Sequence, residues 1–402
     1  MNLLRRTIPV AVAIALAGSA MVRPTQAWSH QGHILLTRLA ALRIIQDEKA
    51  PAELRTFLKS QMPYDLAACE KLATVEVIGA DPVTYQTGLD GAATLPDRIQ
   101  GAEEGRKALA PYGMPEAKMH FLDLEYFAKT IGYQPDLSAC PKVEDFPHDV
   151  TDWRYKQAGF VPFRVEECFG KVVEEFRSPG TMDVAETTRR VGYLAHYLED
   201  SHQPHHSTID YKSLSYLVGK VKGVREIKTP LSEAAGGGDA ISFSAPREIN
   251  PHGDIEFQLF ENADEPRATF RKEFWKELTA RIDKHARDAE YQWPEDQDRV
   301  KAVYDPFKRD LEILRHSYTY LPAVGKAAQA AYAGGTFDPK AFFTSEDTVG
   351  GEKMTMVQII AEQNARAVLE VEKTLRRAWT QAQAAGPATV PAPASATVPG
   401  AK

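Results

Sequence analysis

The segment from His196 to His206, H-Y-L-E-D-S-H-Q-P-H-H, holds four histidines and two acidic residues within eleven positions. Apolar residues recur at helical spacing before it, so His196 and Asp200 are expected on one helix face, one turn apart. Pro204 cannot donate a backbone hydrogen bond and should end this helix, which places His205 and His206 on the turn beyond it. Such an arrangement can present three metal-binding atoms to one pocket, and the alternative is a solvated, histidine-rich helix end.

Four other places in the chain carry residues of the same chemical kind. They are W-S-H-Q-G-H at the expected mature N-terminus, an acid expected on a loop in L-P-D-R, the segment M-H-F-L-D, and a second H-x3-E pair on an expected helix. A packed aromatic, a structural acid or a core histidine would explain each place alone, but these explanations are poor in combination. All the groups are of types that zinc accepts, and they comprise Trp28, through a freed α-amine, His33, Asp97, His120, His196, Asp200, His206, His252 and Glu256.

The order of these motifs is similar to that of a known superfamily. Trp at the mature N-terminus, W-x4-H, a loop Asp, H-F-x-D, H-x3-D-x5-H and H-x3-E resemble the trinuclear-zinc superfamily. That superfamily unites bacterial phospholipase C with the single-strand-specific nucleases that are also 3′-nucleotidases. The matching positions run from Trp28 to Glu256. The resemblance implies a mainly α-helical fold, a single helical bundle of the phospholipase C/nuclease type with long loops and a metal cleft.

The resemblance also implies the ligands of three Zn²⁺ ions. One zinc would be held by Asp97, His120, His196 and Asp200, and a second by His206, His252 and Glu256. The third would be held by the amine and carbonyl of Trp28, by His33 and by Asp200, which would then bridge two metals. Zinc supplies an activated water and neutralises phosphoryl oxygens, so ester hydrolysis needs no nucleophilic side chain. Asp97 and Asp200 are the catalytic residues on this hypothesis, while His30, His202 and His205 are expected to line the cleft or support ligands.

Several residues bear on the substrate, and they favour different branches of the superfamily. The segment 237–252 resembles a nuclease region, with Asp239 where Asn is usual, and Phe121 and Asp123 match the pair that stacks on and hydrogen-bonds a base. The H-F-x-D motif that holds this pair also occurs among the phospholipases. Phospholipase-like features are Glu256 in place of Asp, Ile255 in place of Trp, and the segment Gly159–Phe163. The arginine that the nucleases place three residues after the loop Asp is Gln100 here, with Arg98 beside the acid instead.

These observations lead to a zinc-dependent phosphodiesterase as the expected activity. A single-strand-specific endonuclease and 3′-nucleotidase, acting on single-stranded nucleic acid or nucleotides, is the favoured form. The first alternative is a secreted phospholipase C that acts on phospholipid head groups. The second is a secreted zinc-binding protein without turnover.

Composition and the first residues bear on the compartment. Residues 1–27 resemble a signal peptide, with basic residues at Arg5 and Arg6, an apolar run over 8–22 and a cleavage site after Ala27. Loss of their three arginines would change the net charge from −7 to −10, which is not the balance of a tight duplex binder. We expect an exported, periplasmic or secreted protein with no transmembrane anchor after cleavage and no stable protein partner.

The remaining chain is expected to form one domain over 28–384, followed by an Ala/Pro-rich disordered tail over 385–402. Helices are expected over 32–45, 51–60, 161–177, 251–262, 266–290, 306–332 and 354–384, and within 96–110. Residues 75–78 fit a short strand or a buried helix, and Ile241 and Phe243 alternate as in a strand within the 206–250 insertion. Cys69, Cys140 and Cys168 would allow one disulfide and an odd thiol, with no pair indicated.

Overall fold

The computed structural model describes residues 28–78, 86–101, 111–129, 131–230, 239–260, 262, 264–288 and 304–386, and this part of the chain is mainly helical. The expected signal peptide lies outside the described residues, as does the tail from residue 387. The α-helices are α1 (His30–Gln46), α2 (Ala52–Gln61), α3 (Leu66–Thr74), α4 (Gly88–Gly101), α6 (Trp153–Ala158), α7 (Val161–Phe176), α8 (Val184–Ser201), α9 (Pro251–Phe257), α10 (Arg267–His285), α12 (Pro306–Tyr318), α13 (Leu321–Ala331), α14 (Pro339–Phe343) and α15 (Met356–Ala385).

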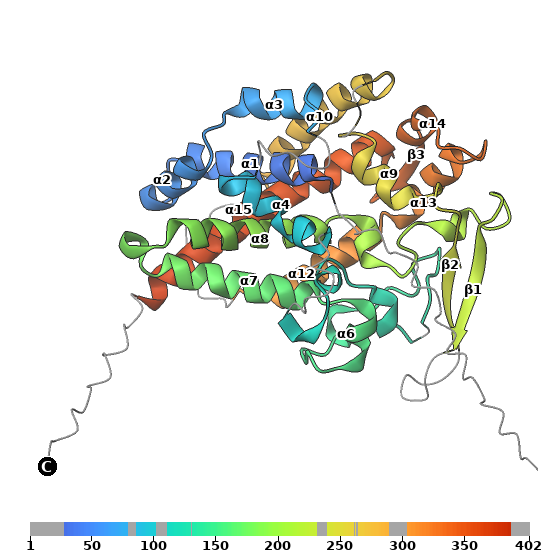
Figure 1. The fold of residues 1–402 in the computed structure, drawn as a ribbon, viewed down its shortest axis with the longest axis horizontal. Coiled ribbons are helices and arrows are strands. Elements are labelled where there is room, and N and C mark those ends of the chain that lie inside the picture. The colour runs from blue at the N-terminus through green and yellow to red at the C-terminus, as the bar shows by residue number, and fades with distance from the viewer. Residues whose placement is uncertain are drawn as a thin grey trace, which may run out of the picture.

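The longest described helix, α15, organises the core. Its thirty residues span about 45 Å, and most of them are buried against α1, α7, α8 and α10. Thr355 begins it with a capping box to Gln358, and Gly386 follows it at a φ of 72°, a conformation that glycine adopts freely. Figure 1 shows α15 crossing the molecule between α1 on one side and α7 and α8 on the other. The helices α1, α4 and α8, which carry candidate ligands, pack on one another, and α1 and α8 also pack on α15.

Two small antiparallel hairpins complete the described fold. Strand β1 (Arg225–Pro230) pairs with β2 (Asp239–Ser244), so that Lys228 lies opposite Ile241. Strand β3 (Glu346–Val349) pairs with β4 (Glu352–Thr355). The strand predicted around Ile241 and Phe243 is confirmed, and the β1–β2 hairpin stands at one edge of the molecule (Figure 1).

Three expectations about local structure are wrong. Residues 75–78 form neither strand nor buried helix, because Val75 and Val77 are exposed and the buried apolar positions belong to α3 before them. The helix expected over 306–332 is two helices, since the chain turns after Tyr318 and α13 begins with Pro322 in its first turn. Asp97 lies on α4 and not on a loop, although Pro96 stands inside that helix.

Short 3-10 turns carry much of the chain between the helices. Residues 102–110, the rest of the expected charged helix, and the Gly236–Gly238 turn lie outside the described residues.

Cys69, Cys140 and Cys168 are all free thiols, so none of them forms the disulfide that the sequence allowed. Within the described part of the chain, no helix combines the length and the hydropathy needed to cross a bilayer.

Candidate metal centre

The helix α8 presents the first two candidate ligands as its spacing predicted. Asp183 caps the start of the helix by accepting hydrogen bonds from the backbone of Ala185 and Glu186. His196 and Asp200 lie one turn apart and are completely buried, with His196 Nε2 3.4 Å from Asp200 Oδ2. The helix ends at Ser201, just before Pro204 begins a short 3-10 turn, so the predicted helix end is confirmed.

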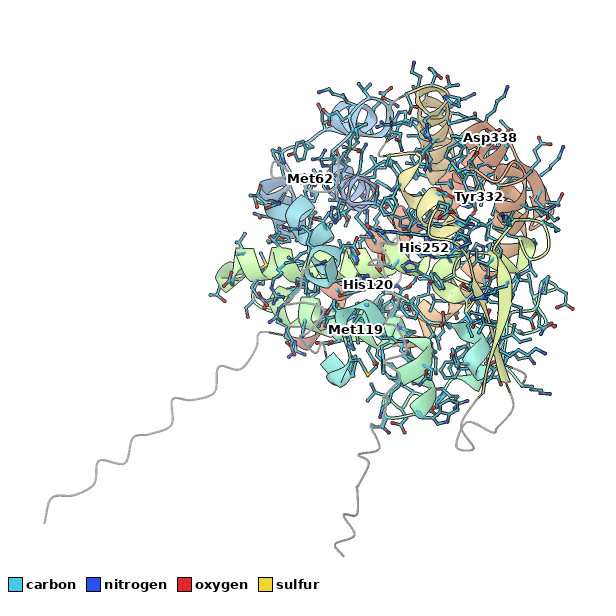
Figure 2. The ribbon with its side chains drawn as sticks, turned by 45° about the vertical axis from the view of Figure 1, so that its right-hand side comes forward. Met62, Met119, His120, His252, Tyr332 and Asp338 are labelled. Carbon is cyan, nitrogen blue, oxygen red and sulfur yellow. The ribbon has the colours of Figure 1, made fainter. Side chains whose placement is uncertain are left out.

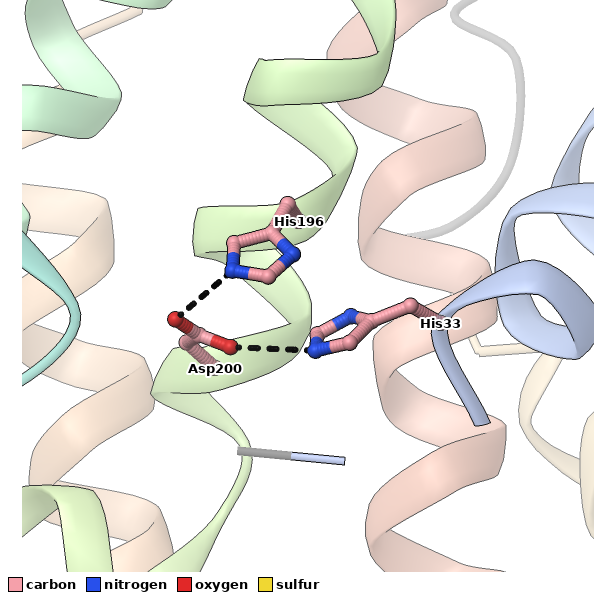
Figure 3. Close-up of side chains that lie close together, drawn as sticks. All are labelled: His33, His196 and Asp200. Carbon is pink, nitrogen blue, oxygen red and sulfur yellow. Dashed lines mark ion pairs between the residues drawn. The ribbon is translucent and has the colours of Figure 1, made fainter. Parts of the chain in front are cut away.

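The first helix brings His33 to the same carboxylate. His33 Nε2 lies 3.5 Å from Asp200 Oδ1, and its ring stacks on that of His196 with centroids 4.0 Å apart (Figure 3). The backbone nitrogen of Trp28 lies 3.4 Å from the same His33 nitrogen. One oxygen of Asp200 therefore faces the Trp28–His33 group and the other faces His196, which is the geometry that a bridging carboxylate requires.

Asp97 and His120 close this cluster from two other segments. His120 Nδ1 lies 2.8 Å from Asp200 Oδ2, and Asp97 Oδ1 lies 3.8 Å from both His120 Nδ1 and His196 Nε2. Both oxygens of Asp97 are buried and receive no hydrogen bond from any residue that the structure describes. Burial of a carboxylate without partners is costly, and a bound cation would remove that cost.

A second cluster joins the turn after α8 to α9. Glu256 Oε1 lies 2.8 Å from His252 Nε2 and 3.7 Å from His206 Nε2. Tyr332 fixes α9 by donating a hydrogen bond to Asp254, which stands between the two α9 ligands, at 2.6 Å. The two clusters are adjacent, because His206 Nδ1 donates to the backbone carbonyl of His120 at 2.6 Å. Figure 2 shows His120 and His252 toward the middle of the molecule.

Hydrogen bonds outside the clusters orient the histidine rings. In four of the five histidines, Nδ1 faces an oxygen that is not a ligand atom at 2.6–3.0 Å, which favours a proton on Nδ1 and leaves Nε2 directed at the cluster. In His120 it is Nδ1 that faces the cluster, 2.8 Å from Asp200 Oδ2. The acceptors are Glu199 for His33, and the backbone carbonyls of Ala93, His120 and Tyr211 for His196, His206 and His252. Metal-binding histidines are commonly held in this way.

Burial controls the protonation of these groups. Burial raises the pKa of Asp200 well above its usual value, and the negative charges of Asp97 and Glu199 raise it further. Burial likewise raises the pKa of Asp97, with a further contribution from Glu256. Burial lowers the pKa of His196 to about 3. His33, His120, His196 and His206, whose pKa values burial lowers, are thus neutral lone-pair donors near pH 7, and the carboxylates need a neighbouring cation to stay ionised.

The donor set therefore fits metal ions. In three triads, one ligand atom from each residue lies within 4.8 Å of the other two: His33, His196 and Asp200; Asp97, His120 and His196; and His206, His252 and Glu256. The structure brings together all eight side chains that the sequence assigned as ligands, with the Trp28 backbone beside His33. Nitrogen and carboxylate donors without thiolates suit zinc.

The remaining histidines stay outside these triads. His202 Nδ1 bonds the Leu198 carbonyl at 2.9 Å, and His205 Nε2 bonds Ser213 Oγ at 2.8 Å. The His205 ring also stacks on His252, with centroids 5.6 Å apart. His205 thus lies beside the second cluster.

The proposed base-binding pair lies directly after His120. Phe121 is half-buried, and its backbone is fixed against Gly159, where a Cβ atom would stand 2.1 Å from the Phe121 carbonyl oxygen. Asp123 donates its backbone N–H to Ala158, and burial raises the pKa of its side chain. Tyr211 is exposed, with its ring 5.9 Å from that of His252. An exposed aromatic ring, that of Tyr211, therefore adjoins the second cluster.

Arg98 does not take the place of the nuclease arginine. Its guanidinium donates to the Gly91 carbonyl at 2.7 Å, so it folds back along α4. Gln100 is buried. In this contact Arg98 turns back along its own helix, and Gln100 carries no charge.

Sequence reasoning missed Glu199 and Ala93 as partners of ligands. Glu199 is three residues from His196 and is a neighbour on the helix surface, so its position gave a usable signal. The Ala93 carbonyl gave none, because its role depends on how α4 packs on α8. Comparison with known proteins adds no name to this site, since neither a protein-family model nor a curated protein matches the chain.

Proposed function

We propose that this protein is a zinc-dependent hydrolase of phosphoric esters. The observation that carries the proposal is the position of Asp200, whose Oδ1 faces His33 at 3.5 Å while Oδ2 faces His120 at 2.8 Å. A buried carboxylate shared between two groups of histidines suits a pair of close metal ions, and close metal pairs are characteristic of phosphoryl-transfer enzymes.

Bound zinc would supply Lewis acidity and a water of lowered pKa. The chain supplies the positions. Asp200 would hold two metal sites at a fixed separation, and Asp97 would add negative charge to one of them. The hydrogen bonds donated by Nδ1 of His33, His196, His206 and His252 keep each Nε2 directed inward. A phosphoric ester bound there would meet ligand side chains that are already in position and need not reorient during the reaction.

Single-stranded nucleic acid or a nucleotide is the substrate class that we propose. Phe121 and Asp123 would hold a base, and residues 212–228 of the insertion add positive charge beside the second cluster. Residues 212–228 contain five Lys or Arg residues and one acid, in a chain whose net charge is −7. The insertion adjoins the site because the Tyr211 carbonyl accepts the hydrogen bond from His252. Exposed cations at this place suit a phosphate backbone that runs out of the site.

A phospholipase C remains the second candidate, supported by Glu256 as an acidic ligand and by the Gly159–Phe163 segment against Phe121. The deciding experiment compares hydrolysis of single-stranded DNA, 3′-AMP and phosphatidylcholine by the cleaved, zinc-loaded protein. Turnover of the first two substrates is expected. Turnover of phosphatidylcholine alone would select the phospholipase, and zinc binding without any turnover would select a non-catalytic zinc protein.

The charge of the insertion gives a test of the nucleic-acid substrate. Lys222→Glu combined with Lys228→Glu should weaken binding of single-stranded DNA and reduce the slope of log affinity against log salt by roughly 1.4, because two phosphate contacts are lost. Both lysines are exposed. Hydrolysis of 3′-AMP should not change, because a mononucleotide does not reach the hairpin.

The matched control is Lys272→Glu with Lys276→Glu, which makes the same charge change at exposed positions of α10. This pair should leave the salt slope of DNA binding as in the wild type. Equal salt slopes for the hairpin variant and the wild type would contradict a role for the hairpin in holding the strand.

Processing at Ala27 gives a second test, since the third zinc needs a free amine on Trp28. A chain with extra residues ahead of Trp28 should hold two zinc ions and lose activity, while the chain that begins at Trp28 holds three. Elemental analysis of zinc per chain measures this. An extended protein with three zinc ions and full activity would show that the Trp28 amine is not a ligand.

A further inference from the structure

Glu199 joins the N-terminal segment to α8 through three contacts. Its carboxylate is completely buried, with Oε2 2.7 Å from His33 Nδ1 and Oε1 accepting a hydrogen bond from Thr37 Oγ1 at 2.8 Å. Its backbone carbonyl accepts the indole N–H of Trp28 at 2.9 Å. Glu199 therefore holds both Trp28 and His33. These are the two residues of the third site that do not lie on α8.

These contacts determine which nitrogen of His33 is available. An ionised Glu199 would keep the proton on Nδ1 and leave Nε2 as the nitrogen for a metal. This Nε2 lies 3.5 Å from Asp200 Oδ1 and 3.4 Å from the Trp28 nitrogen. Thr37 lies one helical turn from His33 and holds the second carboxylate oxygen, which prevents the Glu199 side chain from rotating away. The ring of His33 therefore has one orientation.

Among the four ligand histidines whose Nδ1 faces a partner that is not itself a ligand atom, His33 differs in the charge of that partner. His196, His206 and His252 each donate to a neutral backbone carbonyl, whereas His33 faces a carboxylate. The Trp28–His33 site also has the least negative charge of its own, because the α-amine, the carbonyl and the imidazole are neutral and Asp200 is shared with the neighbouring site. Beside a bound cation, an ionised Glu199 would add a negative charge behind His33 without occupying a coordination position.

We propose that Glu199 is the positioning residue of the third metal site. It sets the tautomer of His33, anchors Trp28 and raises the affinity of this site for a cation above what Trp28, His33 and half of a shared Asp200 provide. The inference rests on the proposed function, because it takes the third site to be a metal site. It adds a buried acid, three residues from His196, to the residues on which zinc content depends.

The test measures zinc binding by Glu199→Ala and Glu199→Gln in buffers of fixed free zinc, with zinc per chain determined by elemental analysis. Loss of such an outer partner lowers metal affinity by about 10–100-fold. Glu199→Ala should therefore hold two zinc ions where the wild type holds three, and should regain the third at about 10–100-fold higher free zinc. The free zinc that Glu199→Gln needs to hold a third ion should lie between the values for the wild type and Glu199→Ala. The reason is that its amide oxygen still accepts a hydrogen bond from His33 but carries no charge.

Glu370→Gln is the matched control. Glu370 is also a completely buried carboxylate, on α15, where it pairs with Arg309. This control should lose thermal stability but keep three zinc ions of wild-type affinity. Circular dichroism establishes that each variant is folded. If Glu199→Ala does not fold, zinc binding by Glu199→Gln provides the test.

Two results would overturn the role of Glu199. In one, folded Glu199 variants bind three zinc ions with wild-type affinity. In the other, all three affinities fall together, which would make Glu199 a general structural residue. A wild-type protein that binds zinc but hydrolyses no phosphoric ester would overturn the proposed function and leave this assignment standing. A wild-type protein that binds no zinc would overturn both.

Discussion

Asp200→Asn is expected to remove two zinc ions and to reduce hydrolysis at least about 10²-fold, the scale on which one electrostatic group acts in a transition state. The reason is geometric. Asp200 Oδ1 lies 3.5 Å from His33 and Oδ2 lies 2.8 Å from His120, so this residue serves both groups of ligands. An amide offers one neutral oxygen in place of two charged ones, and neither metal keeps its bridging anion. Zinc per chain and kcat/KM on the best substrate of the assay measure the two effects.

Asp310→Asn is the matched control for that variant. Asp310 lies on α12 and is completely buried like Asp200, but it belongs to none of the triads. Burial raises its pKa to about 8, so it is mostly protonated at pH 7 and an amide resembles it closely. The control should keep three zinc ions and its activity. If Asp200→Asn lost at most one zinc and still hydrolysed substrate, Asp200 would not be a bridge.

The spacing in the sequence was sufficient to predict that two ligands lie side by side wherever they share one helix. His196 and Asp200 on α8, and His252 and Glu256 on α9, follow from a four-residue interval, because residues one turn apart share a helix face. The grouping of residues from different segments followed from the order of the motifs and not from local pattern. The mainly helical fold could be predicted because long segments such as α15 repeat apolar residues at helical spacing.

Other features depend on packing that a single sequence does not encode locally. Asp97 was expected on a loop, and a proline such as Pro96 usually marks a helix boundary. In the structure α4 continues through Pro96 because it packs closely on α8, where a Cβ on Gly192 would lie 2.4 Å from that of Ala92. The same contact brings the Ala93 carbonyl to His196. The role of Glu199 likewise appears only once α1 lies against α8.

Removal of zinc should destabilise the protein, and increasingly so as the pH rises. A site filled at 1,000 times its dissociation constant contributes about 4 kcal/mol to stability, so a chelator should lower the melting temperature markedly. Burial raises the pKa of Asp97, Asp200 and Glu199 in the metal-free fold. Acids whose pKa is higher in the folded than in the unfolded chain stabilise the fold below about pH 4 and lose that contribution as the pH rises through the folded pKa.

The histidines act in the opposite direction. Burial lowers the pKa of His196 to about 3 and that of His33 well below its usual value. Their contribution is present above about pH 6.5 and is lost as the pH falls toward the folded pKa. Above about pH 6.5, ionisation of the buried carboxylates still destabilises the metal-free fold, whereas the buried histidines no longer do. Bound zinc would offset the negative charge of these carboxylates. The difference in melting temperature between zinc-loaded and chelator-treated protein should therefore widen from pH 5 to pH 8, as measured by calorimetry, whereas a constant or shrinking difference would show that these carboxylates do not bind the metal.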